Sequence, residues 1–66
     1  MATRLRIRRT VLDLQQQDVA RLANIGQGRL SEYEHGRKTP SDETLQRLAT
    51  VLECHPDEIR GEYQHD

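Results

Sequence analysis

The sequence predicts one small all-α domain of five short helices, for three reasons. The chain has 66 residues, well under the roughly 150 that usually form a domain, so we expect a single small domain and not a large enzyme. Its apolar residues recur at helical spacing, and no alternating run of β-branched residues indicates a strand. Hydrophobic residues make up 33% of the chain and its only aromatic residues are Tyr33 and Tyr63, which predicts a thin aliphatic core.

The first two predicted helices span residues 3–13 and 16–23. Leu5 and Leu12 are the apolar positions of the first helix, and good helix formers surround them. The second helix has four apolar residues at helical spacing, namely Val19, Ala20, Leu22 and Ala23. Asn24 follows, and because Asn tolerates a left-handed conformation better than most residues, it is expected to end this helix.

The third predicted helix spans residues 27–34 and is short and strongly polar. Gly26 can cap its start, and Leu30 and Tyr33 form its buried face. A loop follows, in which Gly36 supplies a positive φ after the helix end.

The fourth helix is predicted to begin after Ser41, a favourable capping residue, with Asp42 and Glu43 in the first turn, where the helix dipole favours acidic side chains. Its apolar stripe consists of Leu45, Leu48, Ala49 and Leu52. His55 and Pro56 then open a last helix of one or two turns through Ile59, because proline fits a first helical position.

Charge is unevenly divided along the chain. Residues 1–40 hold eight Lys or Arg against four Asp or Glu, a net charge of +4, whereas residues 41–66 hold two against seven, a net charge of −5. A polyanion such as nucleic acid would be attracted to the first part and repelled by the second. The alternative is an ordinary solvated surface on which charges happen to segregate.

Only about three residues, 24–26, separate the second and third helices, and so short a connection makes the two helices cross steeply as a helix-turn-helix. The segments 16–20 (QQDVA), 24–27 (NIGQ) and 56–59 (PDEI) carry a family pattern. So do Leu30, Glu34, Gly36, Pro40-Ser41 and Thr44-Leu45. Through these positions the sequence resembles the phage-repressor helix-turn-helix domains, also called lambda-repressor-like, Cro-type or xenobiotic response element domains, from about residue 4 to residue 59.

This resemblance implies a sequence-specific DNA-binding transcriptional regulator, expected to be a repressor that binds a near-palindromic operator on double-stranded DNA as a homodimer. Together with the length of the chain, it gives an expected single domain over residues 1–66, with its core at 4–59, where the resemblance runs, and a C-terminal tail at 60–66. We expect dimerisation through the fifth helix and its neighbours, which would place two copies of the third helix about 34 Å apart in successive major-groove segments. The alternative is a protein-interaction module, such as an antitoxin or antirepressor subunit, suggested by the acidic second part and by a small apolar patch of Ile7 and Val11. These two residues could instead pack under the chain's own tail.

The resemblance places base-reading residues on the outward face of the third helix, at Gln27, Gly28, Arg29 and Glu32. The Gln27 amide can bond adenine N6 and N7 together. Gly28 loses a base contact but lets the backbone approach the groove closely. Arg29 is equally suited to guanine and to phosphate, and Glu32 either accepts from cytosine N4 or pairs with Arg29. An ordinary solvated helix face is the alternative for all four.

Phosphate contacts are expected from the start of the second helix and from the region after the third. Gln16 lies beside unpaired backbone amides at the positive end of the helix dipole, unless it only bonds its own backbone. The full set of expected phosphate contacts is Gln15, Gln16, Gln17, Ser31, His35, Arg37 and Lys38. Arg9 and Glu34 match family positions that form a partly buried ion pair between the first helix and the end of the third.

Several other functions are not expected. The histidines and the single Cys54 have no four-ligand metal spacing, so we expect neither metal nor cofactor. No nucleophile comes with a base at a useful spacing, which argues against an enzyme. Cys54 cannot form an intramolecular disulfide and is expected in the core, and the chain shows no apolar stretch typical of a secretory signal or membrane span. We therefore expect a cytoplasmic protein without membrane contact.

Overall fold

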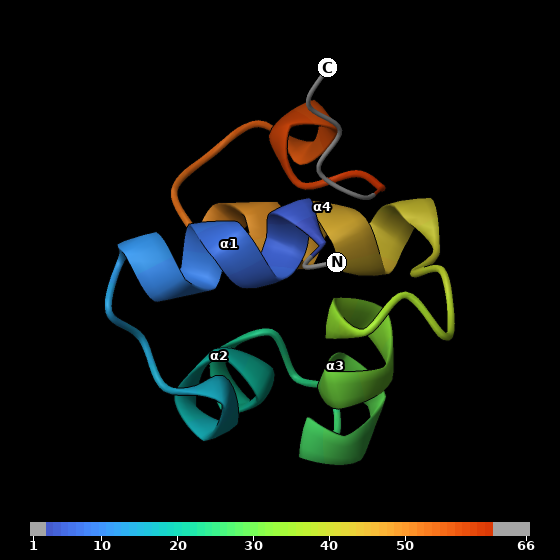
Figure 1. The fold of residues 1–66 in the computed structure, drawn as a ribbon, viewed down its shortest axis with the longest axis horizontal. Helices are drawn as coiled ribbons and strands as arrows, with labels where there is room; N and C mark the ends of the chain where they lie inside the picture. Colours follow the sequence, from blue (N-terminus) through green and yellow to red (C-terminus); the bar gives the residue numbers. More distant parts are fainter. Residues whose placement is uncertain (1–2, 62–66) are drawn as a thin grey trace.

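The computed structural model describes residues 3–61 (Figure 1). Within this range it contains four α-helices and one 3-10 turn: α1 (Arg4–Val11), α2 (Gln16–Leu22), α3 (Gln27–Glu34), α4 (Asp42–Val51) and η1 (Pro56–Glu58). The predicted all-α class is therefore confirmed for this part of the chain, whereas the prediction of five helices is not, because the fifth element is a single 3-10 turn. Tyr63 and the rest of the predicted tail beyond Gly61 lie outside the described residues.

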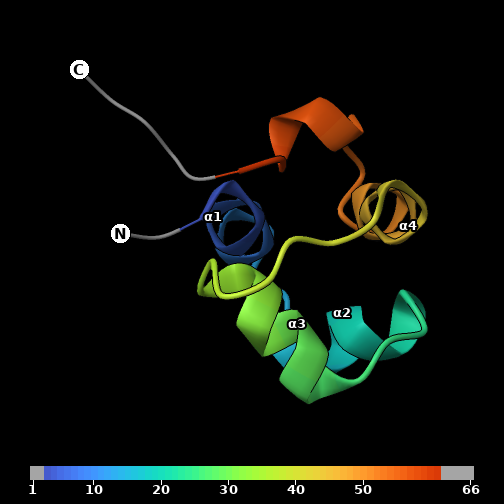
Figure 2. The ribbon, with the colours of Figure 1, turned by 90° about the vertical axis from the view of Figure 1, so that its right-hand side faces the viewer.

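The helices form layers that leave α3 at one side of the domain. Helices α1 and α4 lie across the middle, η1 lies on one side of them, and α2 and α3 lie on the other side (Figures 1 and 2). Contacts join α3 to both α2 and α1, and α4 to both η1 and α2. The core thus lies between the α1–α4 layer and the α2–α3 pair.

Hydrogen bonds and backbone conformation set the helix ends. The hydroxyl groups of Thr3 and Ser41 accept from the backbone N–H of Arg6 and Thr44, each at 3.2 Å, and cap α1 and α4. The predicted positive φ angles at Asn24 and Gly36 are present, at 59° and 73°.

Helix α1 ends earlier than predicted. We expected it to continue to Asp13, but Asp13 has a φ of 58°, which no residue inside a right-handed helix can adopt, and the helix stops at Val11.

Eleven buried apolar residues form the core: Leu5, Val19, Ala20, Ala23, Leu30, Tyr33, Leu45, Leu48, Ala49, Leu52 and Ile59. The prediction that Leu22 belongs to the buried face of α2 is wrong, because its side chain is 61% exposed. The buried face of α2 is centred between Ala20 and Ala23, and at 3.6 residues per turn Leu22 lies about 130° away from that centre. Cys54 is a free thiol that is only partly buried and packs against the core.

The turn η1 stays short because the chain leaves helical geometry at Ile59, which has a φ of −119° and inserts into the core. The side chains of His55 and Glu58 cap its start reciprocally, through the bonds from Asp57 N–H to His55 Nδ1 and from His55 N–H to Glu58. Burial of Ile59 therefore takes precedence over continuing the helix. Among the described residues, none of the helices has the length and apolar composition needed to span a membrane.

Candidate nucleic-acid interface

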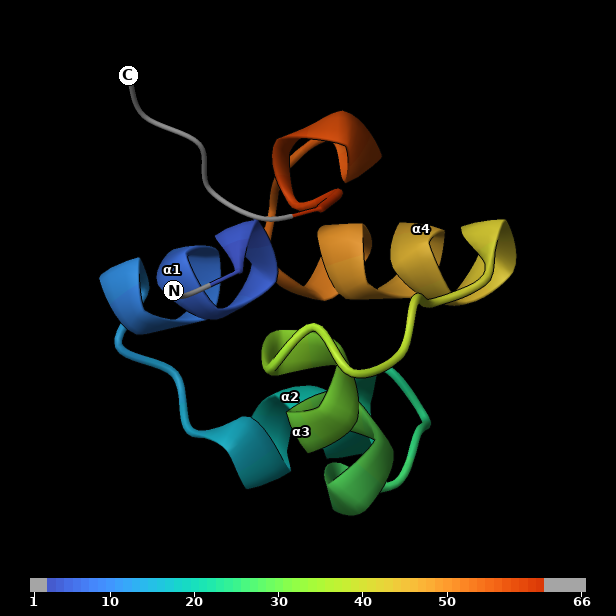
Figure 3. The ribbon, with the colours of Figure 1, turned by 45° about the vertical axis from the view of Figure 1, so that its right-hand side comes forward.

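Helices α2 and α3 form the predicted helix-turn-helix. Residues 23–26 connect them, and α3 crosses α2 steeply and projects from the side of the domain away from η1 (Figures 1 and 3). Leu30 and Tyr33 fix the inner face of α3 in the core, as expected, and Glu34 is also buried. Because three buried side chains hold one face, the opposite face of α3 is rigidly presented to solvent.

The expected base-reading residues lie on that outer face. Gln27, Gly28 and Arg29 are exposed, and Glu32 is partly exposed. Apart from its chain neighbours and the nearby backbone of α3, a Cβ atom built on Gly28 would have no heavy atom of the described residues within 4 Å, so packing within the domain does not require glycine there.

Glu32 pairs with a different partner from the one expected. Its carboxylate lies 3.5 Å from Lys38 Nζ, and no ion pair with Arg29 is formed within the described range. The Glu32 carbonyl also accepts from the backbone N–H of Arg37 at 2.9 Å. These bonds hold the loop after α3, with exposed Arg37 and Lys38, beside the outer face of the helix.

Ser31 and His35 form a local contact at the end of α3. His35 is exposed, and its Nδ1 atom lies 2.7 Å from the Ser31 carbonyl oxygen, so Nδ1 carries the proton and donates. The other ring nitrogen of His35, Nε2, takes no part in this contact with Ser31.

The start of α2 brings Gln15, Gln16 and Gln17 together. Gln15 occupies the N-cap position without a side-chain capping bond among the described residues, and both Gln15 and Gln17 are exposed. Gln16 does not bond its own backbone. Its amide instead donates to Glu34 Oε1 at 3.2 Å, and its carbonyl oxygen accepts from Gln27 Nε2 at 3.3 Å.

Arg9 and Glu34 form the ion pair that the resemblance implies. Arg9 Nε and Nη2 donate to Glu34 Oε2 and Oε1 at 2.5 and 3.0 Å, and Arg9 Nη1 donates to the Leu14 carbonyl at 2.8 Å. The Glu34 side chain is 1% exposed. This bidentate pair joins α1, the α1–α2 loop and the end of α3. Sequence reasoning missed that Gln16 and Gln27 continue the network, since no residue spacing reveals amide orientation.

Two other positioning residues were not predicted. Thr3 is buried and its hydroxyl donates to the Glu34 carbonyl at 2.8 Å. Arg8 donates from Nε and Nη2 to the carbonyls of Leu52 and Glu53, at 3.0 and 3.1 Å, and so satisfies the end of α4. Two of the arginines counted in the basic first part, Arg8 and Arg9, therefore serve the domain itself.

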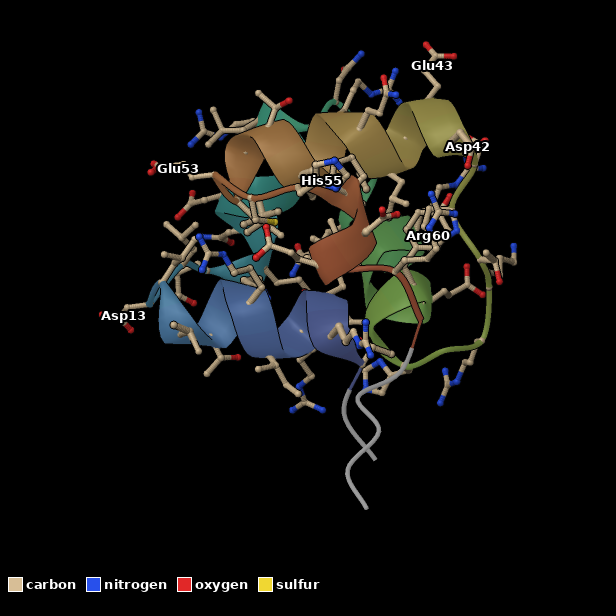
Figure 4. All side chains as sticks on the ribbon, turned by 90° about the horizontal axis from the view of Figure 1, so that it is seen from above. Asp13, Asp42, Glu43, Glu53, His55 and Arg60 are labelled. Carbon is tan, nitrogen blue, oxygen red and sulfur yellow. The ribbon has the colours of Figure 1, made fainter. Side chains whose placement is uncertain are left out.

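Charged groups of both signs lie on the other side of the domain. Figure 4 looks onto the face formed by α1, α4 and η1, with α2 and α3 behind it. Asp42 and Glu43 lie at one end of α4 and Glu53 lies beyond its other end, and Arg60 is placed near Asp42, at 3.5 Å between Nη1 and Oδ1. Arg47 also lies 3.4 Å from Glu43, and α1 carries four arginines and no acidic residue, so the opposite charges on this face largely offset one another.

No group of three or more His, Cys, Asp or Glu side chains with the arrangement of a metal site occurs within residues 3–61. Burial raises the pKa of the Cys54 thiol above its usual value, and the nearby Arg8 partly offsets this increase.

Comparison with known proteins identifies relatives. A family model described as helix-turn-helix matches residues 5–59. The crystal structure of the restriction-modification controller protein C.AhdI from Aeromonas hydrophila is 32% identical, with a TM-score of 0.81 and 85% of each chain covered. Comparison with curated protein sequences gave no match.

Two structures of the P22 c2 repressor are also similar. The solution structure of its DNA-binding domain is 28% identical over 85% of this chain and 74% of that one, with a TM-score of 0.81. The crystal structure of P22 c2 repressor in complex with a synthetic operator is 28% identical over 86% of both chains, also with a TM-score of 0.81. The chain therefore belongs to the Cro/C1-type helix-turn-helix family, which comprises lambda-repressor-like, non-enzymatic DNA-binding domains of transcriptional regulators.

Proposed function

We propose that this protein is a sequence-specific repressor that binds a near-palindromic DNA operator as a homodimer and inserts α3 into the major groove. The observation that carries the proposal is the outer face of α3, where Gln27 and Arg29 are exposed while Leu30 and Tyr33 hold the helix from behind. The P22 c2 repressor, crystallised with an operator, has the same fold and supports this role.

Base reading is assigned to Gln27, Gly28, Arg29 and Glu32. Gln27 presents an amide suited to adenine, and Arg29 presents a guanidinium suited to guanine O6 and N7. Gly28 offers backbone without a side chain, and the open space around it suits close approach to the groove. Glu32 can accept from cytosine N4, and Lys38, which lies 3.5 Å from its carboxylate, would stay beside it or turn to a phosphate.

Phosphate contacts are assigned to two groups on either side of α3. The first group is the start of α2, with Gln15, Gln16 and Gln17. The second group comprises Ser31, His35, Arg37 and Lys38, of which the last three are exposed. These groups would fix the register of the domain on DNA without carrying sequence information.

Dimerisation is assigned to η1 and neighbouring residues, which replace the fifth helix expected from the sequence. A dimer would place two copies of α3 about 34 Å apart, one helical turn of DNA. The protein would act in the cytoplasm, where its free Cys54 remains reduced.

Selection of duplexes from a random pool tests the proposal. We expect an enriched site with two-fold symmetry and an affinity that falls steeply with salt, because phosphate contacts release counterions. The alternative role as a protein-interaction module, for which the 69% exposed Val11 is the main support, predicts neither a preferred site nor steep salt dependence. That second result would overturn the proposed function.

A further inference from the structure

A continuous chain of side-chain hydrogen bonds links the interior of the domain to the exposed start of α3. It begins at the Arg9–Glu34 ion pair and passes through Gln16 to Gln27, over three helices. Glu34 is almost completely buried, whereas Gln27 is exposed. The buried end of the chain is therefore fixed by packing and by Arg9, and the exposed end is free to meet a ligand.

The direction of each bond in this chain follows from the chemistry of Glu34. A carboxylate paired with arginine only accepts hydrogen bonds, while a glutamine amide has one donating and one accepting side. The Gln16 NH2 group must therefore face Glu34, which leaves the Gln16 carbonyl oxygen toward Gln27. For the same reason the Gln27 NH2 group faces Gln16.

This direction limits what Gln27 can offer to a base. One N–H of Gln27 is committed to Gln16, so the amide keeps its second N–H as a donor and Oε1 as an acceptor. Adenine presents one acceptor and one donor in the major groove, N7 and the N6 amino group, and matches that pair. Guanine presents two acceptors, N7 and O6, and would need two donors.

We propose that Glu34 is a positioning residue for base selection, which acts through Gln16 to fix the direction of the Gln27 amide and so makes Gln27 prefer adenine over guanine. This inference rests on the proposed function, because it requires Gln27 to reach a base edge. Glu34 itself touches no base, since it is buried behind α3.

Glu34→Gln tests the inference, because a glutamine is nearly isosteric but can present either a donor or an acceptor to Gln16. Arg9→Lys is the matched control. It weakens the ion pair yet keeps the carboxylate, and so keeps the direction of the bonds. Both variants lower stability, but only the first removes the acceptor-only group.

The readout is the ratio of affinities for two duplexes, the site selected by the wild type and the same site with G·C in place of the A·T pair contacted by Gln27. We expect the wild type and Arg9→Lys to prefer the first duplex by about tenfold, and Glu34→Gln to lose most of that preference. A full preference in Glu34→Gln, or an equal loss in Arg9→Lys, would overturn the inference.

A second variant and a second measurement cover the case in which Glu34→Gln does not fold. Gln16→Met removes the middle amide at a partly exposed position, and should lower affinity for both duplexes and also reduce the ratio. In nuclear magnetic resonance spectra of the protein without DNA, the side-chain NH2 signals of Gln27 should shift in Gln16→Met but not in Arg9→Lys. Unshifted signals overturn the hydrogen-bond chain itself, whereas a wild type that selects no duplex overturns the proposed function.

Discussion

Glu34 is buried with its charge, and it keeps that position because three other side chains bond it. Arg9 and Gln16 donate to its carboxylate, and the Thr3 hydroxyl donates to its backbone carbonyl. Removal of one partner from a buried ion pair leaves an uncompensated charge, which costs more than the pair contributes when intact.

We therefore expect Arg9→Ala and Glu34→Ala each to lower the free energy of unfolding by about 3 kcal/mol or more. The double variant should lose less than the sum of the two, with a coupling of roughly 1 kcal/mol or above. Urea unfolding of all three variants measures this coupling. Strictly additive losses would show that the two side chains stabilise the domain independently.

Cys54 should react slowly as a nucleophile. Burial raises its pKa, and because the thiolate is the reactive form, less of it is present at a given pH than in the unfolded chain. At pH 8 we expect iodoacetamide to alkylate Cys54 more slowly in the native protein than in urea. Equal rates under the two conditions would contradict the raised pKa.

At the scale of elements, residues with strong local preferences explain why the bounds of some helices were predictable. Asn24 and Gly36 favour positive φ angles by their chemistry, and Ser41 caps by its hydroxyl, so local sequence was sufficient for the bounds of α3 and the start of α4. The end of α1 was missed because Asp13 takes a left-handed conformation that its residue type permits but does not require. The reduction of the fifth helix to η1 depends on the burial of Ile59, which is a tertiary contact.

In the candidate DNA interface, the exposed positions of α3 were predictable, whereas the bonds between side chains were not. Spacing and family resemblance placed Gln27 and Arg29 on an outer helix face, since helical geometry alone separates them from Leu30 and Tyr33. The pairing of Glu32 with Lys38 and the bonds of Gln16 depend on side chains from different elements, so no local pattern could indicate them.

The exposure of Leu22 on α2 can be tested by comparing its truncation with that of a buried leucine. Leu22 is 61% exposed, whereas Leu48 of α4 is completely buried. We expect Leu22→Ala to change the free energy of unfolding by about 0.5 kcal/mol or less, and Leu48→Ala to lower it by roughly 3 kcal/mol. Urea or thermal unfolding distinguishes the two. A large loss in Leu22→Ala would mean that Leu22 is covered in solution.

A substitution at Gly28 is expected to change the stability of the domain and its affinity for DNA in opposite directions. Its surroundings leave room for a methyl group, and alanine favours a helix more than glycine does, so Gly28→Ala should stabilise the domain by roughly 0.5–1 kcal/mol. If the backbone approaches DNA closely at Gly28, the same variant binds its selected site more weakly. Unfolding and binding measured on one preparation give both effects. Unchanged affinity would remove Gly28 from the interface.

At the scale of the whole molecule, the basic residues of the first part have different roles, although a count of net charge treats them alike. Arg8 and Arg9 satisfy carbonyl and carboxylate groups of the domain, while Arg29, Arg37 and Lys38 remain exposed around α3. Asp42 and Glu43 of α4 lie on the opposite face, where they pair with Arg60 and Arg47 (Figure 4). The exposed cations around α3 would attract a polyanion to this side of the domain before any base contact forms.

The central claim is that α3 enters the major groove. Replacing single purines of the selected duplex by their 7-deaza analogues tests it most directly, because the change removes only the N7 acceptor of the major groove and keeps base pairing. We expect about tenfold losses of affinity at a few purines, grouped in two clusters one helical turn apart. Uniform affinity across all 7-deaza duplexes, together with losses on 3-deaza substitution in the minor groove, would contradict this account.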